Sequence, residues 1–170
     1  MSGAAIGLKM GFGYPGTFAR SGDCYIMQRP VVSGGADIPF GAPVTVEADG
    51  TFKKFDAAGT LAKFAGVAVR EVKQATDYYA TMGVYKAKEP CDVIERGNVV
   101  VTCVEGTPDP TKGVYVATSA GTNVAIGDFC AVAAPAGGAT TVQLTNCRWV
   151  NTSVDANKAT ELAIVSRNNG

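Results

Sequence analysis

The sequence predicts an all-β protein, a sandwich or barrel of many short strands with an extended glycine-rich N-terminal arm. Two observations support the β class. The 170 residues include 21 glycines and eight prolines, so that no stretch of about a dozen residues keeps a helical period without a breaker. Short runs rich in valine, threonine and aromatic residues recur instead. Turn residues separate them at a spacing of about 8–12 residues, which is typical of sandwiches and barrels.

The predicted strands follow the arm and continue almost to the C-terminus. Alternation supports several of them: Val67 and Val69, for example, share one face. Residues 99–104 are apolar on both faces, which predicts a central place in a sheet or between packed layers. Turn residues at 48–50 and 155–158 separate neighbouring strands. The strands are predicted near residues 24–28, 43–47, 51–55, 64–72, 82–85, 91–94, 98–104, 113–118, 129–133, 141–144, 148–153 and 160–165.

Residues 1–22 differ from the rest of the chain. They contain six glycines and show no strand alternation, so we expect an extended arm followed by a β-domain over residues 23–170. Two lobes that meet near residues 105–112 are an alternative division of that domain. Ordering a free arm costs conformational entropy, and contacts with a partner offset this cost. We therefore predict that the arm makes intersubunit contacts. The residues expected to make these contacts are Gly11, Phe12, Tyr14, Pro15 and Phe18.

Charge and composition exclude several kinds of partner. Fifteen basic and fifteen acidic residues cancel along the whole chain. Without a basic stripe to neutralise phosphates, nucleic acid is not an expected partner. No apolar run approaches the ~20 residues that span a bilayer, so we expect no membrane partner either. The N-terminus lacks a charged region ahead of an apolar stretch, and we therefore expect synthesis in a cytoplasm rather than secretion.

The sequence contains no credible catalytic machinery, so an enzyme is not expected. Histidine is absent, which removes Ser-His-Asp and Cys-His catalysis and most zinc sites. The absence of histidine does not exclude an enzyme that uses paired carboxylates or a lysine. The carboxylates Glu89, Asp92 and Glu95 stand among basic residues, and this pattern predicts a solvated loop beside a strand. We expect no catalytic and no metal-binding residues.

One glycine pattern has the spacing of a cofactor site. Gly11, Gly13 and Gly16 match GxGxxG, and Asp37 follows about twenty residues later. In a dinucleotide site these glycines follow a buried strand and open a helix. Neither a strand pattern before them nor an amphipathic helix after them is present, so the segment is interpreted as an arm with a turn, and no cofactor is expected.

Five cysteines are more than a chain of this length usually carries, and none forms a Cys-x-x-Cys pair. Two interpretations remain open. Free cysteines behave as small buried hydrophobes, which suits Cys103 in its valine run. Alternatively, an odd number of thiols leaves one available for an interchain disulfide in an oxidising medium. The preferred candidates for such a bond are Cys24, close to the arm, and Cys147, near the end of the chain.

Four segments in order resemble the structural cement, or decoration, proteins of tailed-phage capsids. Residues 64–74 (FAGVAVREVKQ) contain a similar Gly-Val-Ala-Val-Arg strand, and Tyr85 with residues 89–101 (EPCDVIERGNVVV) resembles the Val-x-x-Arg-Gly-x-Val-x-Val strand that follows it. Residues 14–19 (YPGTFA) resemble the N-terminal Pro-Gly segment of that family. Residues 38–44 (IPFGAPV) resemble the segment that enters its first long hairpin.

The resemblance implies a protein without catalytic residues. It implies binding to the outside of an assembled phage shell, where the protein bridges coat subunits and stabilises the shell. The expected partners are the major capsid protein and copies of the protein itself, with a trimer as the expected oligomer. The expected location is the virion exterior, after synthesis in the host cytoplasm. An adhesion module on a virion or cell surface that binds carbohydrate is the alternative from another functional class.

Overall fold

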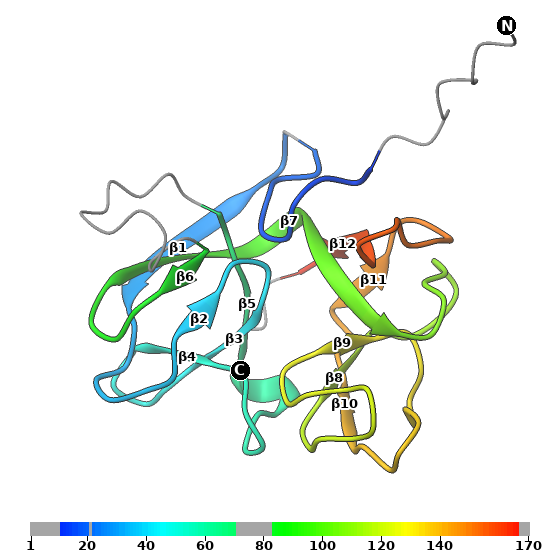
Figure 1. Ribbon diagram of the computed structural model, residues 1–170. Coiled ribbons are helices and arrows are strands. Elements are labelled where there is room, and N and C mark those ends of the chain that lie inside the picture. Colours follow the sequence, from blue (N-terminus) through cyan, green and yellow to red (C-terminus); the bar gives the residue numbers. More distant parts are fainter. Residues whose placement is uncertain (1–10, 21, 71–82, 167–170) are drawn as a thin grey trace, which may run out of the picture.

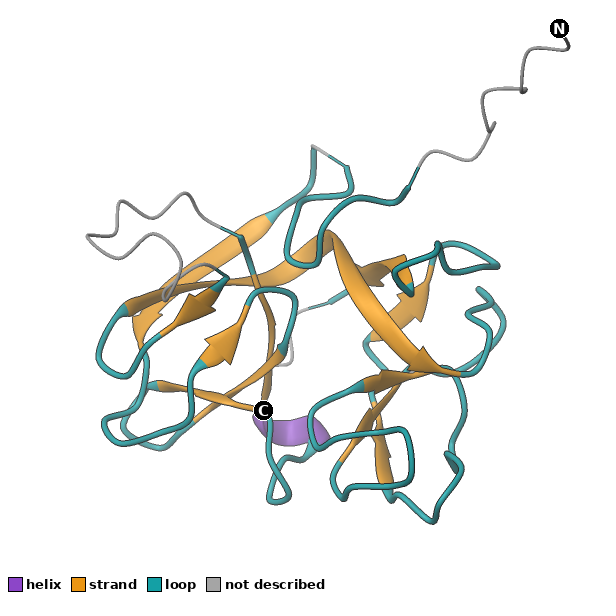
Figure 2. Ribbon diagram, viewed as in Figure 1, coloured by secondary structure: helices purple, strands orange, loops and turns teal. Residues whose placement is uncertain are grey.

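The computed structural model describes residues 11–20, 22–70 and 83–166, and within these ranges the protein is essentially all β. The one helical turn there is a 3₁₀ turn at Leu61–Lys63, drawn purple in Figure 2. The predicted fold class is thus confirmed (Figure 1). The strands are β1 Tyr25–Pro30, β2 Ile38–Pro39, β3 Pro43–Val46, β4 Phe52–Lys54, β5 Phe64–Ala68, β6 Val84–Tyr85, β7 Pro90–Glu105, β8 Tyr115–Ala117, β9 Phe129–Cys130, β10 Thr141–Gln143, β11 Cys147–Trp149 and β12 Ala159–Ile164.

The 16-residue strand β7 organises the molecule. Its first half pairs antiparallel with β1 along one edge and with β5 along the other. Its second half pairs antiparallel with β12, and its end pairs in parallel with β9. The main sheet therefore runs in the order β10-β8-β9-β7-β5-β3-β4, with β1, β12 and β11 attached at its side. β2 and β6 form a separate two-stranded sheet.

The strands around the first half of β7 close into a barrel-like ring. Beyond β1, Val31 bridges to Phe52 of β4, and the Val32 amide donates to the Phe52 carbonyl at 2.8 Å. This contact joins the two ends of the series β1-β7-β5-β3-β4. This contact covers the strand edges next to Val31 and Phe52, where an open sheet would leave them exposed.

β5 and the first half of β7 separate two apolar cores. Val67 and Val69 point into the larger core, and Ala68 between them points into the smaller one. In β7, Val93 belongs to the smaller core and Ile94 to the larger. This alternation confirms the predicted shared face of Val67 and Val69, and it shows why both strands are apolar on both sides.

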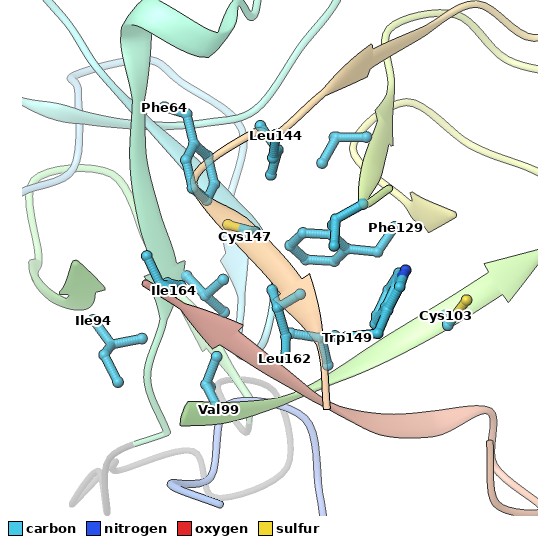
Figure 3. Packing of buried hydrophobic residues seen from close by; sticks show 14 of the residues in the cluster. Phe64, Ile94, Val99, Cys103, Phe129, Leu144, Cys147, Trp149, Leu162 and Ile164 are labelled. Atoms are coloured by element: carbon cyan, nitrogen blue, oxygen red, sulfur yellow. The ribbon is translucent and has the colours of Figure 1, made fainter. Parts of the chain in front are cut away.

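The larger core contains Trp149 of β11, whose side chain is fully buried. Figure 3 shows Phe129 of β9 and Leu162 of β12 beside it. The indole Nε1 donates to the Gly113 carbonyl at 3.1 Å. This hydrogen bond satisfies the one polar atom of the ring, as a buried tryptophan requires.

The strand boundaries differ from the predicted ones in two informative places. The predicted strands 91–94 and 98–104 are one continuous strand, because Gly97 (φ +129°) lets β7 bend without ending. The two-residue strand Ile38–Pro39 was not predicted, and it is defined by its pairing with Val84 and Tyr85. Residues 71, 72 and 82 of the predicted strands lie outside the described residues. The division into residues 1–22 and 23–170, with or without lobes meeting near 105–112, stays a prediction.

Candidate functional site

The described part of the N-terminal arm, residues 11–20, lies along the second half of β7 (dark blue in Figure 1). The Gly16 amide donates to the Val100 carbonyl at 2.8 Å, and the Val100 amide donates to the Thr17 carbonyl at 2.9 Å. The Ala19 amide donates to the Asn98 carbonyl at 3.1 Å. Phe18 and Val99 form an antiparallel bridge. The arm thus supplies hydrogen-bond partners to backbone groups of β7 that β12 does not reach.

Gly16 lies in close contact with a second glycine, Gly41. Both have positive φ, +83° and +79°. A Cβ atom on Gly16 would lie 2.9 Å from the Gly41 nitrogen and 3.0 Å from the Ala68 carbonyl oxygen. The Arg70 amide donates to the Gly16 carbonyl, and the Gly41 amide donates to the Ala68 carbonyl, both at 2.8 Å. Three segments that resemble the cement proteins therefore meet here: residues 14–19, 38–44 and 64–74.

Two polar contacts attach the arm to the hairpin of β11 and β12. The Phe12 amide donates to Asp155 Oδ2 at 3.2 Å. Arg20 Nε lies 2.7 Å from Oε1 of Glu161, a carboxylate buried in β12. Asn98 Nδ2 donates to the same oxygen at 2.9 Å. The hydrogen bond and charge of Glu161 raise the pKa of Arg20. Because a buried carboxylate needs a partner, Glu161 and the arm stabilise each other.

Two large apolar side chains of the arm remain directed toward solvent. Tyr14 is 69% exposed and Phe18 is 45% exposed. The exposed guanidinium of Arg70 lies 5.0 Å from the centre of the Tyr14 ring, within the range of a cation–π contact. Exposed aromatic side chains and arginines are typical of protein-binding surfaces. We call Tyr14, Phe18 and Arg70 the arm surface.

The predicted arm residues thus divide into two groups. Gly11, Phe12 and Pro15 lie in the stretch that attaches to the chain's own β-domain, whereas Tyr14 and Phe18 present exposed rings. Arg70 and Glu161 were not predicted. For Glu161 the sequence does hold a signal, since one carboxylate in the apolar run 159–164 indicates a buried, paired charge. The predicted intersubunit contact itself stays a prediction.

The five cysteines differ sharply in exposure. Cys24 is exposed, and the other four are buried. Burial raises the pKa of Cys103 to about 11 and that of Cys130 to about 12. Burial also raises the pKa of Cys147. Because the thiolate is the reactive form, Cys24 is the accessible member of the candidate disulfide pair, and a bond through Cys147 requires the larger core to open.

We expect one rapidly reacting thiol in the native protein and five after unfolding in urea. Cys24 is the reactive residue, since the other four thiols are buried and burial also raises the pKa of Cys103, Cys130 and Cys147. Absorbance during reaction with Ellman's reagent at pH 8 measures both numbers. A Cys24→Ser variant should lose the rapid phase and keep the slow one. Rapid reaction that persists in this variant would contradict the assignment.

The other motifs have structural explanations. Residues 15 and 16 form a turn, and bends and a bridge residue rather than a helix follow over residues 17–20. Asp92 accepts from Gln28 Nε2, and Glu89 accepts from the Lys86 amide, each at 2.8 Å. No group of three His, Cys, Asp or Glu in the described ranges could hold a metal ion. Within those ranges, too, no helix has the length and apolar character to cross a membrane.

Comparison with known proteins agrees with this geometry. A chain in the structure of the capsid of Myoviridae phage XM1 has the same fold, with a TM-score of 0.66, 19% identity and coverage of 94% of both chains. No curated protein sequence is detectably similar to the chain. The family model described as structural cement protein (E217 gp24/Pam3 gp6) matches residues 3–168. The protein therefore belongs to the structural cement protein family.

Proposed function

We propose that the protein binds the outer surface of an assembled phage shell and bridges coat subunits to stabilise it. The observation that carries this proposal is the match to the cement family over residues 3–168. Its partners are the major capsid protein and further copies of itself, assembled as trimers on the shell. The protein is synthesised in the host cytoplasm and is located on the virion exterior.

Apolar burial and hydrogen bonds at each contact supply the stabilising free energy. Tyr14 and Phe18 project from the body, and burying a large apolar side chain contributes about 1.5–3 kcal/mol. Arg70, beside Tyr14, adds a planar set of donors for a carboxylate or a carbonyl. One such contact contributes little against the force with which packaged DNA pushes coat subunits apart. Symmetry repeats it over the whole shell, and each protein that bridges two subunits gains from the high effective concentration of the second.

Removing the exposed rings of the arm surface should weaken binding to shells without unfolding the protein. In a Tyr14→Ala/Phe18→Ala variant the backbone hydrogen bonds of Gly16, Thr17 and Ala19 to β7 remain available. We expect at least a tenfold loss of affinity for shells stripped of this protein, measured by co-sedimentation, because aromatic anchors dominate protein interfaces. A second variant that lacks residues 1–10 tests the part of the arm before the described contacts.

The matched control is Ile126→Ala, which removes another exposed apolar side chain, at 36% exposure, from the connection between β8 and β9. It should bind shells like the natural protein. Urea unfolding must show the two substitution variants within about 1 kcal/mol of the natural chain, as expected for exposed positions. Unchanged shell binding by both arm variants would refute the role of the arm. Absence of shell binding by the natural chain would refute the proposed function.

A further inference from the structure

Along the outer edge of β1, the backbone groups of Ile26 and Gln28 have no backbone partner among the described residues. The Val31 amide donates to the Glu89 carbonyl, and the Lys88 amide donates to the Val31 carbonyl, both at 2.9 Å. Residue 31 therefore faces the β7 side. Because successive residues of a strand direct these groups to opposite edges, Ile26 and Gln28 direct theirs outward.

The pairing of β7 with β5 shows independently that the backbone groups of Gln28 point outward. The Val69 amide donates to the Asp92 carbonyl at 2.8 Å, so Asp92 directs its backbone groups toward β5. Gln28 lies opposite Asp92 in the register. Its own amide and carbonyl consequently point away from β7. Among the strands that the structure describes, β1 is hydrogen-bonded only to β7.

The open stretch lacks the usual protection of an edge strand. Charged side chains, prolines or a covering segment normally block such edges. Here Ile26 is 43% exposed, Gln28 is uncharged, and the proline comes only at position 30. Arg29 does not protect the edge, because its guanidinium donates to the Gly50 carbonyl at 3.0 Å and lies over the Phe52 ring.

We infer that a second copy of the chain pairs with this edge, β1 against β1 and antiparallel, about a twofold axis at Met27. In this register Ile26 lies opposite Gln28 of the second copy, and Gln28 lies opposite Ile26 of the second copy. Each opposed pair exchanges two hydrogen bonds. All four outward amide and carbonyl groups of these two residues are then satisfied on both copies.

The sequence of β1 favours this register and this occupant. A shift that centres the axis on Gln28 would place Ile26 opposite Pro30, which has no amide to donate. In the register centred on Met27, no like charges oppose each other, since the one charged residue of β1, Arg29, lies opposite Tyr25. A strand that is complementary to itself in this way is the condition for an isologous contact.

The contact is separate from any contact within a trimer, because a twofold pairing uses the same strand on both copies and cannot close a ring of three. It is small, so the free protein pairs weakly. Copies held side by side on a shell have a high effective concentration, and there the same contact links neighbours. This use on a shell rests on the proposed function, whereas the pairing itself does not.

Disulfide trapping of two single-cysteine variants tests the pairing and its register. Ile26→Cys and Gln28→Cys are each made in a Cys24→Ser background, which removes the exposed native thiol. The two full-length proteins are mixed at high concentration, oxidised and separated without reductant. The mixed dimer is told from the two homodimers by mass spectrometry. We expect the ratio of mixed dimer to homodimers to exceed its statistical value by about fivefold, because only residues 26 and 28 lie directly opposite each other. A statistical mixture, or no dimer, would overturn the inference.

Ile26→Lys supplies the second measurement. Two lysines at the paired edges should weaken the self-association measured by sedimentation equilibrium by about tenfold, through the loss of two cross-strand contacts. Ile126→Lys adds the same charge at another exposed isoleucine, distant in sequence, and should leave association unchanged. Equal association of both lysine variants would overturn the inference even if shells bind the natural protein. Self-association without shell binding would instead refute only the proposed function.

Discussion

Replacing Trp149 by alanine should lower the free energy of unfolding by about 3–5 kcal/mol, the range for a fully buried tryptophan. The side chain lies in the larger core, beside Phe129 of β9 and Leu162 of β12 (Figure 3). Its loss removes apolar burial and leaves a cavity that the surrounding strands fill only in part. It also removes the donor to the Gly113 carbonyl. Urea unfolding followed by circular dichroism measures the change, since the variant has no tryptophan left to report by fluorescence.

Trp149→Phe separates the two contributions. Phenylalanine retains most of the apolar volume but cannot donate to Gly113, so we expect this variant to lose about 1–3 kcal/mol. Ile126→Ala, at an exposed position, serves as the surface control and should change stability by less than about 0.5 kcal/mol. A Trp149→Ala protein within 1 kcal/mol of the natural chain would show that this ring does not stabilise the core, whatever its burial.

The sequence predicts strands reliably where the pattern is local. The hairpin of β3 and β4 was predicted by its strands and by the turn at residues 48–50, where Asp49 accepts from the Thr51 amide. β7 was predicted as two strands, 91–94 and 98–104, with residues 95–97 between them. Its continuity depends on tertiary contacts: the segment containing Asp23 and Cys24 crosses the strand at Gly97, where a Cβ atom would lie 3.0 Å from the Cys24 sulfur.

The attachment of the arm had no sequence signal of its own. It is made largely by backbone hydrogen bonds, which carry no side-chain pattern, so residues 11–20 lack strand alternation although they lie along β7. The ion pair of Arg20 and Glu161 joins positions 141 residues apart. Tyr14 and Phe18 were predicted as contact residues, because contacts with a partner offset the entropy that ordering a free arm costs. Only the structure shows which side of the arm they occupy.

Gly16→Ala should release the arm from the β-domain and lower the free energy of unfolding by about 2–4 kcal/mol. A positive φ costs an alanine about 1–2 kcal/mol. The remainder comes from forcing apart a close backbone contact, because the new Cβ would lie 2.9–3.0 Å from the Gly41 nitrogen, the Ala68 oxygen and the Arg70 nitrogen. None of these atoms belongs to a flexible side chain. Hydrogen exchange at the Val100 amide, which donates to Thr17 of the arm, should accelerate strongly.

Gly34→Ala is the matched control, since Gly34 has a similar φ of +74° but open space around the position of a Cβ atom. The Gly34→Ala variant has the backbone strain but no close contact. Its free energy of unfolding should fall by about 1–2 kcal/mol, and hydrogen exchange at the Val100 amide should not accelerate. Equal effects of the two substitutions would show that strain, and not the contact of Gly16 with Gly41, explains the loss. If Gly16→Ala releases the arm and the protein still binds stripped shells fully, the arm surface needs no fixed position. If binding falls together with Val100 protection, the contact of the two glycines positions Tyr14 and Phe18 for the coat.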